Sequence, residues 1–174
     1  MSDFERTVPF IRRLENLSSG DRARFKRSAG KTLSEAGDAL GLLYRVLPAG
    51  VAQRDEETYF LVATLFPLAD AAQRGDFGAA LRQAKERSGA KGMDRRVEIL
   101  LDADMAQLPH RLRQTIRYLK ASEVRVNWLG LLSDLLLWTH PKRMVQQRWA
   151  RAYFAEHKAN PETQIKPNPE TVPA

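Results

Sequence analysis

The sequence predicts an all-α protein, built as two packed helical bundle halves with a disordered C-terminal tail. Two observations exclude a β-rich fold: β-branched residues are sparse and scattered, and no run of five residues alternates apolar and polar side chains convincingly. A third observation supports helices directly, since apolar residues recur at helical spacing along most of the chain. The 174 residues are enough for one sizeable core or for two small helical units.

The first half is predicted over residues 1–91 and begins with a helix over 4–17. The segment Ser18-Ser19-Gly20 breaks this helix and caps a short basic helix over 21–29, which Gly30 ends. Ser34 can cap the next helix. That helix ends before Pro48, because the residue before a proline disfavours helical backbone angles.

A central helix is predicted next. Asp55-Glu56-Glu57 places acid where the helix dipole favours it, and the segment 59–63 that follows is apolar on nearly all sides. We therefore expect this helix to be buried and Pro67 to kink or end it. Asp76 can cap a further helix, and the segment 87–92 then has the composition of a linker between the two halves.

The second half is predicted over residues 92–158 and contains four helices. The helices are centred on 97–101, 107–121, 128–138 and 142–157, with Asn127 as a cap for the third. Trp128, Trp138 and Trp149 lie on strongly apolar helix faces, so we expect them in the core rather than on a stacking surface. Residues 159–174 contain Asn-Pro-Glu-Thr twice and four of the nine prolines, which is typical of a disordered or extended tail.

The composition excludes several classes of protein. Without cysteine there is no disulfide, thiolate metal site or cysteine nucleophile, and the chain needs no oxidising compartment. The first residues lack the order of a signal peptide, and the longest apolar stretch, near 59–69, is too short to span a bilayer. We therefore expect a cytoplasmic protein without a membrane partner.

The positive charge is concentrated in two places. The chain carries 28 Lys and Arg against 21 Asp and Glu, which gives +7. Residues 106–151 alone carry nine basic and two acidic side chains, also +7, so a polyanionic partner is predicted. The nine basic residues are Arg111, Arg113, Arg117, Lys120, Arg125, Lys142, Arg143, Arg148 and Arg151, and the second cluster is Arg22, Arg24, Lys26, Arg27 and Lys31.

A stripe on the helix over 107–121 favours a binding role over a merely solvated face. Arg113, Arg117 and Lys120 fall within an arc of about 60° beside the apolar stripe of this helix. With no acidic partner one turn away, they repel one another and lower the stability of the helix. Such clusters are suited to following a phosphate backbone without reading sequence.

No catalytic or metal-binding constellation is found in the sequence. His110, His140 and His157 each lack a carboxylate or a second histidine at ligand spacing. A glycine-rich phosphate loop, zinc-ligand spacing and a Gly-x-Ser-x-Gly motif are absent as well. We therefore predict a protein that is not an enzyme and that uses no cofactor or metal.

Five short segments, taken in order, resemble the CasB family, the small subunits of the type I-E CRISPR Cascade effector complex. The resemblance covers roughly residues 4–156 and leaves out the proline-rich tail. The segments are Gly20-Asp21-Arg22-Ala23, Tyr59-Phe60-Leu61-Val62-Ala63, Leu108-Pro109-x-Arg111-Leu112-Arg113-Gln114, Trp128-x-x-Leu131-Leu132-x-Asp134-Leu135 and Gln147-Arg148-Trp149-Ala150-Arg151.

The resemblance implies a non-catalytic subunit of a crRNA-guided surveillance complex that acts in antiviral defence. Such a subunit is present in two copies, contacts the large subunit CasA and the backbone subunits, and helps to hold the target DNA and the displaced strand of the R-loop. It implies that the phosphate contacts are Arg22, Arg24, Arg27, Arg111, Arg113, Arg117, Lys120, Arg148 and Arg151. From the residues alone, a stand-alone helical nucleic-acid-binding protein and a scaffold module that binds acidic protein surfaces remain alternatives.

Overall fold

The computed structural model describes residues 3–155, and every regular element in that range is helical. The α-helices are α1 (Asp3–Glu15), α2 (Ser19–Arg27), α3 (Ala39–Val46), α4 (Glu56–Leu65), α5 (Phe77–Ser88), α6 (Met93–Leu101), α7 (Leu108–Ala121), α8 (Trp128–Leu136) and α9 (Met144–Phe154). Three short 3-10 helices join them: η1 (Leu33–Glu35), η2 (Gln53–Asp55) and η3 (Phe66–Leu68). The all-α fold class is confirmed. The predicted tail lies outside the described residues.

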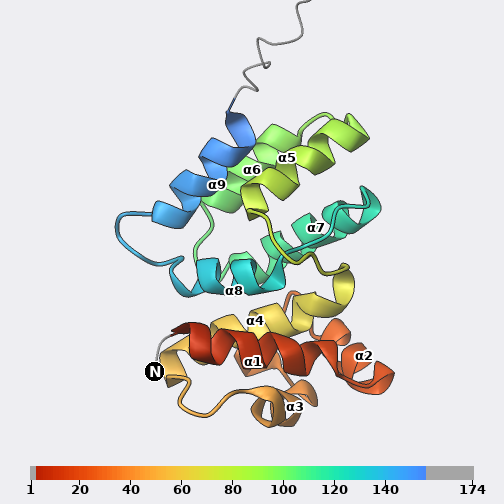
Figure 1. Ribbon diagram of the computed structural model, residues 1–174, viewed down its shortest axis with the longest axis vertical. Coiled ribbons are helices and arrows are strands. Elements are labelled where there is room, and N and C mark those ends of the chain that lie inside the picture. Colours follow the sequence, from red (N-terminus) through yellow and green to blue (C-terminus); the bar gives the residue numbers. More distant parts are fainter. Residues whose placement is uncertain (1–2, 156–174) are drawn as a thin grey trace, which may run out of the picture.

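The helices form two groups with α7 and α8 between them. Helices α1 to α4 lie at one end of the molecule, and α5, α6 and α9 lie at the other (Figure 1). Helix α4 packs against α2, α7 and α8, and all of its residues from Thr58 to Leu65 are buried. Its predicted central position is confirmed, and η3, which contains Pro67, follows its end directly.

Three predicted helix caps are present. The side chains of Ser18, Asp76 and Asn127 accept hydrogen bonds from the first backbone N–H groups of α2, α5 and α8. These bonds satisfy donors that have no partner within a helix, which is why short polar residues start helices.

The prediction that Ser34 caps the third helix is wrong. Ser34 lies inside η1, and α3 begins later, after Asp38. The reason is a capping box around η1, in which the backbone N–H of Thr32 donates to the Glu35 carboxylate over 2.9 Å. The chain then turns through Gly37, whose φ is +55°, before α3 starts.

The three tryptophans lie in the core, as predicted. Trp128, Trp138 and Trp149 are each at most 3% exposed. The rings of Trp138 and Trp149 lie 5.1 Å apart, and the ring of Phe77 lies 4.6 Å from that of Trp149. Both ring pairs are tilted, and aromatic contacts of this kind add to the stability gained from burial.

Helix α5 makes its main contacts with helices that follow it in the sequence. It packs against α9 most extensively and also against α7 (Figure 1). The division of the chain into two halves at residue 91 stays a prediction. By that division α5 belongs to the first half, residues 1–91. Among the described residues, no helix is long and apolar enough to cross a membrane.

Candidate nucleic-acid interface

A groove between α2 and α7 brings basic side chains from distant parts of the sequence together. It has a volume of about 500 Å³, and η3 forms part of its wall. Its lining residues are Lys26, Pro67, Leu68, Arg113, Arg117, Lys120 and Ala121. We refer to it as the α2–α7 groove. One cation of the predicted N-terminal cluster thus lies beside the predicted stripe of α7.

The amphipathic pattern of α7 places its cations beside this groove. The helix buries Leu112, Ile116 and Leu119, which recur at the spacing of one helix face. Arg113 and Arg117 lie on the adjoining face and are exposed. Burial of the apolar stripe therefore places both arginines on the helix face that lines the groove.

Gly30 gives Arg113 room at the end of α2. A Cβ atom on Gly30 would lie 3.0 Å from Cδ of Arg113. The φ angle of Gly30 is +90°, a backbone conformation that residues with a side chain rarely adopt. The sequence marks Gly30 only as the end of a helix. Its contact with an arginine more than eighty residues away is visible only in the structure.

The groove keeps three uncompensated positive charges. The side chains of Lys26, Arg113 and Arg117 form no hydrogen bond or ion pair with any residue in the range 3–155. Lys120 differs, since its ammonium group lies 2.7 Å from the Asp70 carboxylate. This hydrogen bond holds the pKa of Asp70 below its ordinary value. The prediction that the whole stripe lacks compensating acid is therefore wrong for Lys120, because the loop after η3 supplies an acid from elsewhere in the chain.

All three arginines of the N-terminal cluster interact with other parts of the fold. Arg22 donates to the carbonyl of Glu15 over 2.8 Å and lies over the ring of Phe66. Arg24 and Arg27 both pair with Asp38, at 3.6 and 3.4 Å. Lys26 and Lys31 are exposed and form no ion pair within the described part of the chain. In α2 it is Lys26 that faces the groove.

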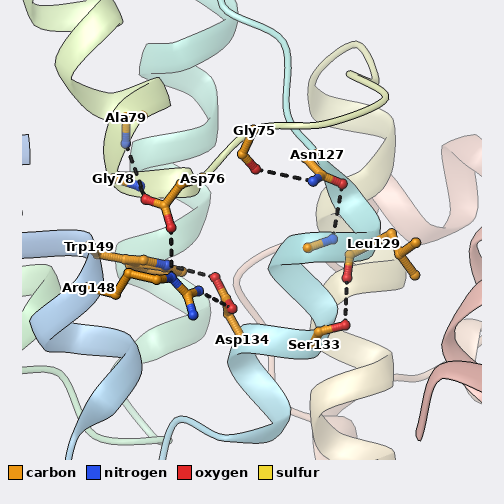
Figure 2. A network of polar contacts seen from close by, with 11 residues as sticks. Gly75, Asp76, Gly78, Ala79, Asn127, Leu129, Ser133, Asp134, Arg148 and Trp149 are labelled. Atoms are coloured by element: carbon orange, nitrogen blue, oxygen red, sulfur yellow. Dashed lines mark hydrogen bonds and ion pairs between the residues drawn. The ribbon is translucent and has the colours of Figure 1, made fainter. Parts of the chain in front are cut away.

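Arg148 lies in a network that joins α5, α8 and α9 (Figure 2). Its guanidinium group donates to Asp76 over 2.8 Å and to Asp134, and the Asp134 hydrogen bond raises the pKa of Arg148. Asp134 also accepts from the indole N–H of Trp149, while Asp76 caps α5. Arg148 thus has two carboxylate partners, and it does not line the α2–α7 groove.

The remaining predicted residues lie away from the groove. Arg143 donates to the carbonyl of Leu101 over 2.6 Å. Arg111 lines a separate hollow beside α6, and Arg125 lines a hollow next to α5. Lys142 and Arg151 are exposed and line none of these hollows.

Comparison with known proteins identifies the family. The sequence profile of the family described as CRISPR-associated protein Cse2 matches residues 21–154. The chain belongs to the Cse2 family. The resemblance to the CasB family, found from five ordered segments, is confirmed.

Individual relatives agree with the Cse2 assignment. The chain is 33% identical over 161 residues to a CRISPR-associated protein Cse2 of Thermus thermophilus, covering 88% of this chain and 91% of the relative. The crystal structure of a Cse2-family protein from Thermus thermophilus is similar with a TM-score of 0.75 and 33% identity, covering 90% of this chain and all of the other. A chain of a CRISPR RNA-guided surveillance complex has the same fold, with a TM-score of 0.73 and 20% identity over 86% of this chain and 92% of that one.

The described residues of this Cse2-family chain contain no group of three or more His, Asp or Glu side chains placed to hold a metal ion. His110 pairs with Gln114, and a ring nitrogen of His140 accepts from the backbone N–H of Lys142. His157 lies outside the described range. That the chain is not an enzyme stays a prediction.

Proposed function

We propose that this Cse2-family chain is a non-catalytic, cytoplasmic small subunit of a CRISPR RNA-guided surveillance complex used in antiviral defence. In that complex it binds the backbone of a DNA strand of the R-loop through the α2–α7 groove. Its other partners are the crRNA, the large subunit CasA, the backbone subunits and a second copy of itself. The observation that carries the proposal is the meeting of Lys26, Arg113 and Arg117 in one groove without a paired carboxylate.

Elementary electrostatics supports this role. Like charges that are held together raise the energy of the folded protein. Binding of a nucleic acid places phosphate groups between them, which removes this repulsion and releases counterions that were bound to the phosphates. R-loop formation exchanges two duplexes of similar stability, so a few backbone contacts can shift the balance. A chain of a surveillance complex shares this fold, which supports the same assembly for this protein.

The buried tryptophans favour charge over base stacking as the source of affinity. Trp128, Trp138 and Trp149 are inaccessible to a strand. Proteins that bind single strands by stacking place aromatic rings on the surface, where each base contributes roughly 1–3 kcal/mol. The groove offers ammonium and guanidinium groups instead. Binding should therefore be sensitive to salt and nearly insensitive to sequence.

The test is the variant Arg113→Ala with Arg117→Ala. Fluorescence anisotropy would measure its affinity for two single-stranded DNAs of unrelated sequence at several salt concentrations. We expect equal weakening for both DNAs. The slope of log affinity against log salt should become shallower by about 1.4, which is about 0.7 for each lost phosphate contact. Circular dichroism should show unchanged helical content, because both side chains are exposed.

The matched control is Arg54→Ala with Arg95→Ala. These arginines are 86% and 75% exposed, pair with neighbouring acids and lie outside the groove. Equal losses for both double variants would contradict binding in the groove. A wild-type affinity that is independent of salt would contradict nucleic-acid binding altogether and favour a scaffold that binds acidic proteins. A loss confined to one DNA sequence would require direct base readout.

A further inference from the structure

We infer that the strand path continues beyond the α2–α7 groove, around the C-terminal end of α7, into a second basic hollow on α5. The ligand of the whole path is a single strand rather than a duplex. This inference rests on the proposed function and adds Arg74 and Arg87 to the binding residues. Arg125, already a predicted binding residue, lies on the same path. We call the second hollow the α5 hollow.

The surface hollows form a continuous series. The α2–α7 groove and a shallow hollow at the end of α7 share Ala121. That shallow hollow shares Arg87 and Glu123 with the α5 hollow. The α5 hollow lies between one face of α5 and the segments 72–76 and 123–125. A strand that leaves the groove at Ala121 thus meets the next hollow at once.

The α5 hollow is positively charged. Arg74 and Arg125 are exposed, and their side chains form no hydrogen bond or ion pair within residues 3–155. Arg87 donates to the backbone carbonyl of Glu123 over 2.6 Å, so no carboxylate cancels its charge.

Three acids lie near this path, and two of them have partners. The Asp76 carboxylate pairs with Arg148. Asp70, which interacts electrostatically with Arg125, pairs with Lys120. Glu123 lines the hollow, so three arginines there face one carboxylate that has no ion pair among the described residues.

The shape of the path selects a single strand. From Arg113 to Lys120 the helix rises about 10 Å, so this part of the path is long enough for only about three phosphates even at the rise of roughly 3.4 Å of a stacked strand. Beyond that point the path crosses the end of α7 toward α5. Duplex DNA has a persistence length of about 50 nm and does not follow a turn of this size, whereas a single strand bends freely. Short strands therefore fill the groove alone, and longer strands reach the α5 hollow.

The test uses Arg74→Ala with Arg125→Ala and a series of single strands from about 6 to about 20 nucleotides, a range that brackets the usual site sizes of single-strand binders. For the shortest strands we expect this double variant to bind with the affinity of the wild-type protein. For the longest strands we expect about tenfold weaker binding and a salt slope shallower by about 1.4. Glu123→Gln should strengthen the binding of long strands only. The pair Arg54→Ala with Arg95→Ala is again the control for lost charge, and a duplex as long as the longest strand should bind all variants equally.

The outcomes separate this inference from the proposed function. If Arg113→Ala with Arg117→Ala weakens every strand while Arg74→Ala with Arg125→Ala weakens none, the continuation is wrong and the groove remains. If neither variant has an effect, the proposed function fails. Equal losses on short and long strands, or an equal loss on the duplex, would also overturn a continuous single-strand path.

Discussion

Gly78 sets the distance between α5 and α9. A Cβ atom at this position would lie 2.3 Å from the backbone oxygen of Trp149 and 2.7 Å from its Cα, far inside any contact distance. Because the obstacle is backbone rather than a flexible side chain, the helices would have to separate. The close contact of α5 with α9 therefore depends on a missing side chain.

Gly78→Ala should lower the free energy of unfolding by about 3 kcal/mol, the upper part of the usual range for overpacking. The control is Gly41→Ala. Gly41 lies in α3, and a Cβ there meets nothing within 4 Å. Alanine is the better helix former, so that variant should be neutral or more stable by up to about 1 kcal/mol. Urea unfolding would measure both. Similar stabilities of the two variants would contradict the close packing.

At this scale the sequence predicts helix caps well and tertiary contacts poorly. Ser18, Asp76 and Asn127 act on backbone groups within three residues, so their role is local and readable. Gly78 and Gly30 depend on Trp149 and Arg113, which are remote in sequence. No pattern along the chain marks such glycines.

Helix α7 shows what an amphipathic pattern predicts and what it omits. The pattern places the apolar face and the flanking cations correctly, because both follow from one helical period. It does not show that Asp70 pairs with Lys120, nor that Lys26 of α2 joins the same groove. Those relations arise when distant elements pack. For the same reason the sequence does not show that Asp76 and Asp134 engage Arg148.

Asp70→Asn should strengthen nucleic-acid binding several-fold. The substitution removes the carboxylate that occupies Lys120, so a fourth cation in the groove becomes free for phosphate. The salt slope should become steeper by about 0.7. Asp102→Asn is the control, since it changes the net charge equally and its partner, Arg143, lies outside the groove. Equal gains for both variants in anisotropy titrations would assign the effect to net charge alone.

For the whole molecule, the fold brings one cation of the predicted N-terminal cluster, Lys26, beside three cations of the predicted cluster in residues 106–151. The α2–α7 groove combines residues from the group of α1 to α4 with residues of α7, which lies between the two groups (Figure 1). Several other arginines hold the helices in this arrangement, as Arg148 does between α5, α8 and α9 (Figure 2). Among the described residues, some of the positive charge therefore stabilises the fold, while the side chains of Lys26, Arg113 and Arg117 in the groove have no ion pair.

The most direct test is R-loop formation by a surveillance complex reconstituted with either the wild-type chain or Arg113→Ala with Arg117→Ala. We expect both complexes to assemble with crRNA. The variant complex should form fewer R-loops on every matched target, by a similar factor for each target and more strongly at higher salt. Equal R-loop formation by the two complexes, over the whole range of salt, would contradict the binding of a DNA strand in the α2–α7 groove.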